Sequence, residues 1–99
     1  MKVVKRDGTT VDYDANKIRV AIQKANNEVS KKERATDEEI QNIINYVEDL
    51  KKRRILVEDI QDIIEQKLME AGRYILAKEY ITYRYTRSLV RQSNTTDQS

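Results

Sequence analysis

Hydrophobic residues recur every three or four positions along four stretches of the chain, as in helices that bury one face. The pattern predicts helices over about residues 15–27, 36–50, 58–71 and 73–91. The expected core positions are the apolar residues of these stripes: Ile18, Ala21, Ile22, Ala25, Ile40, Ile43, Ile44, Val47, Leu50, Ile60, Ile63, Ile64, Leu68, Leu76, Ala77, Tyr80, Ile81, Tyr83, Tyr85 and Leu89. Thr36 and Glu39 form a capping box, and Gly72 suits the position just after a helix.

Ahead of the first helix, two short β-prone runs lie on either side of Asp7-Gly8. Asp-Gly between such runs favours a β-hairpin with a two-residue type I′ turn, in which both central residues have positive φ. That turn would pair Arg6 with Thr9 and place Val4 opposite Val11. The two valines would then share one face of the hairpin, because side chains alternate between the faces of a strand.

The apolar triplet 55–57 is too short for periodicity to assign, and it fits a third small strand beside the hairpin. The expected fold is therefore α+β and mainly helical, a four-helix bundle capped by a small sheet of two or three strands. A chain of 99 residues fits one domain. The polar segment 92–99 has no periodicity and is expected to be a disordered tail, or the start of a linker to a further part of a longer protein.

Basic residues are expected to meet where the hairpin leads into the first helix. Asp14 is a good N-cap, so that Ala15 opens the helix and Lys17 lies in its first turn. Lys5 and Arg6 of the hairpin would then lie beside the same helix start, where free backbone N–H groups and the positive end of the helix dipole attract phosphate. The simpler alternative is a hairpin that carries solvated charges.

Composition excludes several classes of function. The chain has no cysteine and no histidine, which removes thiolate metal sites and the usual general base, so catalysis by this chain alone is not expected. No apolar run approaches the roughly 18 residues of a membrane span, and a cytoplasmic location is expected. The net charge is only +2, and the basic run Lys51-Lys52-Arg53-Arg54 is short for a nucleic-acid patch.

Several separated blocks of the sequence resemble the ATP-cone, a nucleotide-binding regulatory domain of many ribonucleotide reductases and of a bacterial repressor of their genes. The blocks are Val3-Val4-Lys5-Arg6-Asp7-Gly8, followed by residues 11–14, 16–18, 56–61 and 76–84. The resemblance covers residues 1–91 and implies the fold of that family, a four-helix bundle capped by a three-stranded sheet. The tyrosine-rich last helix looks most like the anaerobic ribonucleoside-triphosphate reductase.

The resemblance implies a sensor in which ATP keeps the attached reductase active and dATP in the same pocket shuts it down. Lys5, Arg6 and Lys17 look like phosphate ligands, and Gln61 is expected to face the sugar or the phosphates. The other nucleotide-binding residues that the resemblance implies are the cap Asp14, the pocket walls Val3 and Ile18, and the basic residues Arg84 and Arg87. Mg²⁺ would accompany the triphosphate, held mainly by phosphate oxygens and water.

Two positions depart from the family pattern. Val11 stands where some relatives carry Glu, and Val57 where some carry Thr, which leaves the contacts to the base and the sugar open. The expected partners are an adenine nucleotide, the catalytic domain of the same polypeptide and another cone. Neither a membrane nor nucleic acid is an expected partner.

Two other hypotheses stay open, a nucleotide-responsive DNA-binding or repressor module and a plain helical interaction domain. The related repressor carries a zinc ribbon before its cone, whereas this chain begins with the cone-like segment and has no cysteine.

Overall fold

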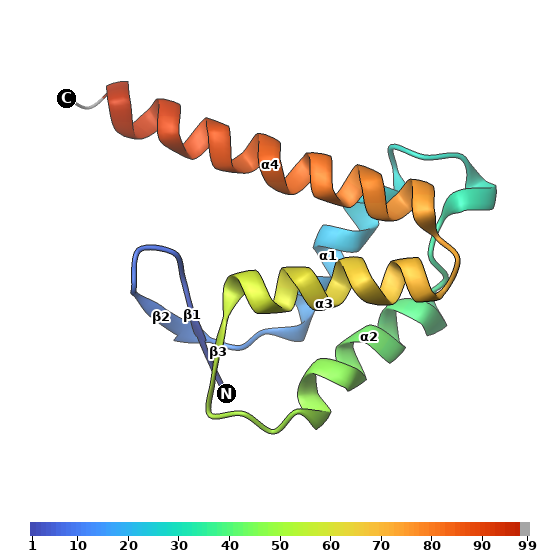
Figure 1. Ribbon diagram of the computed structural model, residues 1–99, viewed down its shortest axis with the longest axis horizontal. Helices are drawn as coiled ribbons and strands as arrows, with labels where there is room; N and C mark the ends of the chain where they lie inside the picture. Colours follow the sequence, from blue (N-terminus) through green and yellow to red (C-terminus); the bar gives the residue numbers. More distant parts are fainter. Residues whose placement is uncertain (98–99) are drawn as a thin grey trace.

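The computed structural model describes the backbone of residues 1–97 and the side chains of residues 1–86 (Figure 1). The strands are Lys2–Val4 (β1), Thr10–Asp12 (β2) and Arg54–Leu56 (β3). The helices are Ala15–Asn26 (α1), the short 3₁₀ helix Lys31–Glu33 (η1), Asp37–Asp49 (α2), Val57–Glu70 (α3) and Tyr74–Asp97 (α4). The predicted fold class, a helical bundle with a small sheet, is confirmed.

The sheet has the order β2-β1-β3, so the first strand is its centre. β1 pairs with β2 antiparallel and with β3 parallel, and the third strand that the sequence suggested is confirmed. In the parallel pair Val3 lies beside Ile55, and both side chains are buried in the core. The sheet therefore joins residues about fifty positions apart in sequence.

The helix ends follow their predicted signals. The Asp14 side chain accepts a hydrogen bond from the Asn16 N–H at 2.9 Å, which makes it the N-cap of α1. The end of α3 is a Schellman motif: the Gly72 N–H donates to the Met69 carbonyl at 3.0 Å and the Arg73 N–H to the Leu68 carbonyl at 2.8 Å. The φ of +80° at Gly72 explains why a glycine stands there.

The predicted turn of the hairpin is wrong. Val3, and not Val4, lies opposite Val11. The Lys5 N–H donates to the Thr9 carbonyl at 2.8 Å, so three residues rather than two form the loop. Only Gly8 among them has a positive φ, at +88°, which fits a turn followed by one residue in the left-handed region.

The side chain of Asp7 gives the physical reason for the different turn. Its carboxylate accepts hydrogen bonds from the Thr9 N–H at 3.0 Å and from the Thr9 hydroxyl at 2.6 Å, and these bonds lower the pKa of Asp7. A type I′ turn would have needed a positive φ at Asp7 itself. Because the loop is one residue longer, Val3 faces the core, and Arg6 lies within the loop.

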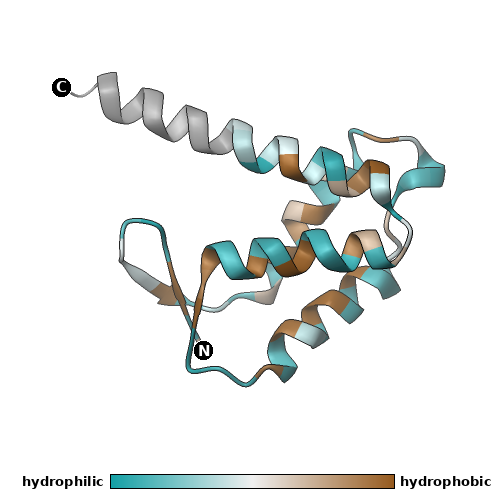
Figure 2. Cartoon of the chain, in the orientation of Figure 1, coloured by the Kyte–Doolittle hydropathy of each residue, from teal (hydrophilic) through white to brown (hydrophobic). Residues whose placement is uncertain are grey.

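One hydrophobic core lies between the helices and one face of the sheet. Figure 2 shows hydrophobic and hydrophilic residues alternating around α2 and α3, as expected for helices with one buried face. Most of the predicted core positions within residues 1–86 are buried, whereas Ile81 and Tyr85 of α4 are exposed, and the side chain of Leu89 lies outside the described residues. No helix within the described residues is long and apolar enough to cross a membrane.

α4 continues to Asp97, beyond Arg91 where the hydrophobic pattern placed its end. The side chains of the segment 92–99 lie outside the described residues, and its role as the start of a linker stays a prediction.

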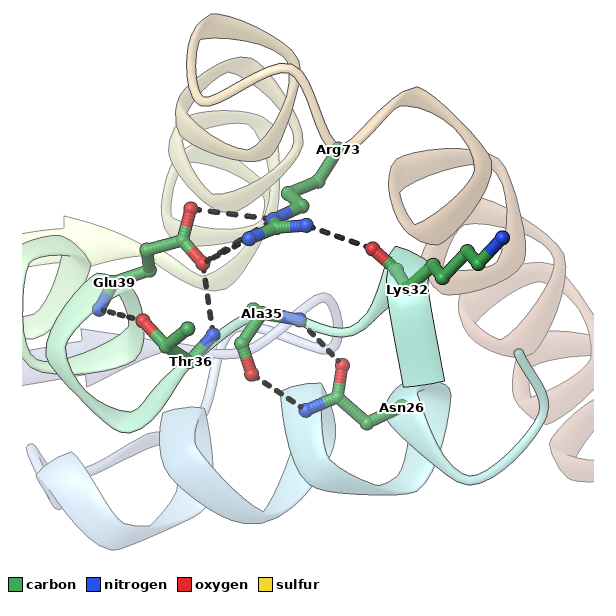
Figure 3. A network of polar contacts seen from close by, with 6 residues as sticks. All are labelled: Asn26, Lys32, Ala35, Thr36, Glu39 and Arg73. Atoms are coloured by element: carbon green, nitrogen blue, oxygen red, sulfur yellow. Dashed lines mark hydrogen bonds and ion pairs between the residues drawn. The ribbon is translucent and has the colours of Figure 1, made fainter. Parts of the chain in front are cut away.

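Polar contacts connect the end of α1 and the starts of α2 and α4 to neighbouring segments (Figure 3). Asn26 of α1 donates to the Ala35 carbonyl at 3.2 Å and accepts from the Ala35 N–H at 3.0 Å. Arg73 forms an ion pair with Glu39 at 3.1 Å and donates to the Lys32 carbonyl at 3.0 Å. The confirmed capping box uses the same carboxylate, because Glu39 accepts from the Thr36 N–H at 2.8 Å while its own N–H donates to the Thr36 hydroxyl at 3.1 Å. The start of α4 is thereby tied to the start of α2.

The charge of Glu39 should stabilise the fold. Partial burial alone would raise the pKa of Glu39, but the hydrogen bond from Thr36 and the charge of Arg73 outweigh it, so the pKa lies below its ordinary value of 4.5. We expect Glu39→Gln to lower the free energy of unfolding by about 1 kcal/mol at neutral pH. The loss should appear in urea unfolding, with Glu38→Gln, which removes an exposed charge from the same turn, close to wild type.

A lowered pKa in the folded state means that the stability from Glu39 is present above pH 4.5 and is lost as the pH falls through the lowered pKa. The gap in stability between wild type and Glu39→Gln should therefore close in acid. A gap that stays constant with pH would show that the carboxylate charge contributes nothing.

Candidate functional site

Two adjoining cavities of about 400 Å³ each lie between the hairpin, α1, α3 and α4. They share six lining residues and therefore adjoin each other, and we call the two together the cleft. The shared residues are Lys5, Lys17, Ala21, Val57, Gln61 and Tyr80. In Figure 1 the hairpin lies beside the first turns of α3, and Arg6 of its loop is 3.2 Å from Glu58 of that helix.

Five cationic side chains line the first cavity, which we call the cationic cavity. They come from the hairpin, from α1 and from α4, and they are Lys5, Arg6, Lys17, Lys24 and Arg84. No Asp or Glu is among the described residues that line this cavity. Such a concentration of one sign of charge raises the local concentration of an anionic ligand.

The N-terminus of α1 lies at the cationic cavity. Asn16 and Lys17 of its first turn line the cationic cavity, and their positions are set by the Asp14 cap. Partial positive charge from the first turn of a helix adds to the charge of the lysines. Phosphate is the anion that suits a helix N-terminus with nearby Lys and Arg side chains.

The second cavity, which we call the apolar cavity, has a different lining. Hydrophobic side chains of the sheet, α1 and α3 form its walls, namely Val3, Val11, Ile18, Val57, Ile60 and Ile64. Polar and charged side chains line it as well, including Lys5, Asp12, Tyr13, Asp14 and Lys17. Tyr13 donates a hydrogen bond to the Glu48 carboxylate at 3.1 Å, and burial together with that carboxylate raises the pKa of Tyr13. The hydrogen bond ties this wall of the cleft to the end of α2.

Gln61 lies where the two cavities meet and lines both of them. Its Oε1 atom is buried and has no hydrogen-bond partner among the described residues. A buried acceptor without a donor costs free energy, so this atom is suited to a hydroxyl or amino group of a bound molecule.

Two of the five cations are already paired with carboxylates of α3. Arg6 lies 3.2 Å from Glu58, and Arg84 lies 2.6 Å from Glu65 and 3.4 Å from Asp62. Partial burial of Arg84 favours its neutral form, but the two carboxylates outweigh this and raise the pKa of the guanidinium. No ion pair within residues 1–86 involves Lys5, Lys17 or Lys24.

The structure brings eight of the nine predicted site residues to the cleft: Val3, Lys5, Arg6, Asp14, Lys17, Ile18, Gln61 and Arg84. The side chain of Arg87 lies outside the described residues. Sequence reasoning missed Lys24, Tyr80 and Tyr83, which also line the cationic cavity. Lys24 could have been found, because it follows Lys17 by seven residues, and residues seven apart share one face of a helix.

The fold and the cleft define a small helical domain in which a cavity lined by five cationic side chains adjoins one with largely hydrophobic walls. The chain belongs to the ATP cone family, because the model of the ATP cone domain matches residues 1–89. ATP cone domains bind adenine nucleotides as effectors, and this chain shares that regulatory domain over nearly its whole length.

Similar proteins are ribonucleotide reductases. The ribonucleoside-diphosphate reductase subunit alpha of Chlamydia trachomatis is 42% identical over 110 residues, which cover 100% of this chain and 10% of that protein. The vitamin B12-dependent ribonucleoside-diphosphate reductase of Thermoplasma acidophilum is 38% identical, over 92% of this chain and 12% of its own. The anaerobic ribonucleoside-triphosphate reductase of Haemophilus influenzae is 33% identical, over 91% of this chain and 13% of its own.

The chain thus spans about a tenth of the length of the curated relatives it matches. It corresponds to the regulatory domain of such proteins and not to their catalytic part.

The glycine of the hairpin loop should stabilise the loop that carries Arg6. Nothing lies within 4 Å of a Cβ built on Gly8, so a substitution there meets only the strain of the +88° φ. We expect Gly8→Ala to cost about 1 kcal/mol of stability, measured by urea unfolding, and Gly8→Asn to cost less, because Asn tolerates this conformation. Equal stability of Gly8→Ala and wild type would contradict this loop geometry.

Proposed function

We propose that this domain is an adenine-nucleotide sensor that sets the overall activity of the ribonucleotide reductase to which it is attached. ATP in the cleft would keep the reductase active, and dATP in the same cleft would inhibit it. The observation that carries the proposal is that the cationic and apolar cavities adjoin and share six lining residues, because a nucleoside triphosphate joins a polyanion to a flat, weakly polar base.

The cationic cavity supplies the charges that a triphosphate needs. Lys5, Arg6 and Lys17 would bind phosphate oxygens, with Arg6 able to donate two parallel hydrogen bonds and the lysines acting as point charges. Lys24 and Arg84 line the same cavity and would extend the site along the phosphate chain. Mg²⁺ would be bound with the triphosphate, held mainly by phosphate oxygens and water.

The apolar cavity would receive the adenine. Val3 and Ile18 give it hydrophobic walls, and Val11 stands opposite Val3 in the sheet. With valine at positions 11 and 57, recognition of the base would depend on shape and burial of apolar surface more than on a carboxylate or a hydroxyl.

Gln61 is placed between the expected positions of the base and the phosphates, where a ribose would lie. Its buried Oε1 atom could accept a hydrogen bond from a sugar hydroxyl. ATP and dATP differ by one hydroxyl, and a ligand shifts a conformational equilibrium only by its differential affinity for the two states. Coupling energies of about 1–3 kcal/mol are typical for such regulation.

The expected partner is the catalytic domain of the same polypeptide. The relatives of this chain include three types of ribonucleotide reductase. The anaerobic type, favoured by the tyrosine-rich last helix, and an association between cones stay predictions within this proposal. The cytoplasm is the location proposed for such a protein.

Removing two cations should abolish nucleotide binding. We expect the double variant Arg6→Ala/Lys17→Ala to show no measurable ATP binding in isothermal titration calorimetry, with unchanged helical circular dichroism. The matched control, Lys52→Ala/Arg53→Ala, removes one Lys and one Arg from the exposed run outside the cleft and should bind like wild type. Equal affinity of the two double variants would show that the phosphates bind elsewhere.

ATP should also raise the melting temperature of the wild-type domain. At a hundredfold excess of ATP over Kd, the free energy of unfolding should rise by about 2.7 kcal/mol.

The opposite effects of the two nucleotides can be tested in the full-length reductase. We expect the reductase to stay active with ATP and to lose activity with dATP. The difference in activity between the two nucleotides should be smaller in Gln61→Leu, because leucine cannot accept a hydrogen bond from the sugar. Gln66→Leu, on the same helix but bonded to Glu70 outside the cleft, should leave the difference intact. Identical activity with ATP and dATP in the wild-type reductase would contradict the proposed switch.

A further inference from the structure

Three carboxylates form one face of α3 beside the cleft. Glu58, Asp62 and Glu65 are spaced by four and three residues, which places them in a row on the helix surface. We call this row the acidic face of α3.

Each member of the acidic face pairs with an arginine of the cationic cavity. Glu58 holds Arg6 of the hairpin loop, and Asp62 and Glu65 hold Arg84 of α4. Both arginines line the cavity proposed for the phosphates. The acidic face therefore connects two arginines that belong to different elements, the hairpin loop and α4.

A guanidinium binds a carboxylate and a phosphate through the same pair of N–H groups. The carboxylates of the acidic face and the phosphates of a nucleotide would thus compete for the same donors. We propose that the acidic face of α3 is an internal counter-anion, which holds Arg6 and Arg84 before a nucleotide binds and which the triphosphate displaces. This inference rests on the proposed function of the cleft and concerns how that site is regulated.

The Arg6–Glu58 and Arg84–Glu65 pairs differ in exposure, so a triphosphate would displace the two carboxylates at different cost in free energy. The side chains of Arg6 and Glu58 are 41% and 54% exposed, so water screens their attraction and the pair exchanges readily. The side chains of Arg84 and Glu65 are only 21% and 18% exposed. Displacing Glu65 leaves a partly buried carboxylate without its cation, so this pair opposes binding more strongly.

The Arg84 pair also connects two helices. Arg84 belongs to α4 and its partners to α3, so a ligand that takes Arg84 removes a bond between the helices that form two walls of the cleft. A ligand without phosphates has no anionic oxygens to replace the carboxylates that bind Arg84. The acidic face would therefore select for ligands with several negative charges and would link their binding to the contact between α3 and α4.

Neutralising Glu65 tests the inference, because competition predicts tighter ATP binding and a positioning role predicts weaker ATP binding. We expect Glu65→Gln to bind ATP about threefold more tightly or better in isothermal titration calorimetry, because the triphosphate no longer competes with a carboxylate. Adenosine should bind the variant and wild type equally. If Glu65 instead positions Arg84 for the phosphates, the same substitution weakens ATP binding.

Two controls separate competition from general effects of charge. Glu70→Gln removes the same charge from α3 but from a pair with Lys67 outside the cleft, and it should leave ATP affinity close to wild type. In an Arg84→Gln background, Glu65→Gln should give no gain, since the competition needs both partners. Asp62→Asn, at the more exposed carboxylate, should give a smaller gain and serves if Glu65→Gln fails to fold.

The outcomes distinguish this inference from the proposed function. Absence of ATP binding by wild type would overturn the proposed function and the inference with it. Binding by wild type, with unchanged or weaker binding by Glu65→Gln and Asp62→Asn, would overturn the inference alone. A gain in Glu70→Gln equal to that in Glu65→Gln would also overturn it, because net charge alone would then explain the effect.

Discussion

The parallel pairing of β1 with β3 is the constraint on which the cleft depends. It aligns Val3 with Ile55, two buried residues from opposite halves of the chain. Because α3 begins directly after β3, this pairing places the loop that carries Arg6 beside the first turns of α3. A hairpin free to move away from α3 would leave Lys5 and Arg6 in solvent, and they would no longer line the cavities beside α1 and α3.

Much of the fold could be predicted because its signals are local. The helix stripes follow from periodicity, and the caps at Asp14, Thr36 and Gly72 follow from side chains that bond their own neighbouring backbone. The prediction of a type I′ turn in the hairpin was wrong, and the reason is also local. The Asp7 side chain bonds Thr9 and favours a three-residue loop over the type I′ turn that Asp-Gly suggests.

The candidate site could be predicted less completely, because its electrostatics depend on tertiary contacts. Sequence identified residues of the hairpin and the first helix as neighbours, and the structure places them on one cleft. The partners of Arg84 could not be deduced, since Asp62 and Glu65 reach it only through the packing of α3 on α4. The chain's membership of the ATP cone family supports the assignment of this cleft to a nucleotide.

The most direct test of the nucleotide cleft is to follow the backbone amide resonances of the domain while ATP is added. We predict that the largest changes fall on the loop around Arg6, on Asn16 and Lys17 at the start of α1, and on Gln61. Changes that concentrate instead on the separate groove between α2 and α3, lined by Tyr46 and Lys67, would contradict it, as would resonances unmoved by millimolar ATP.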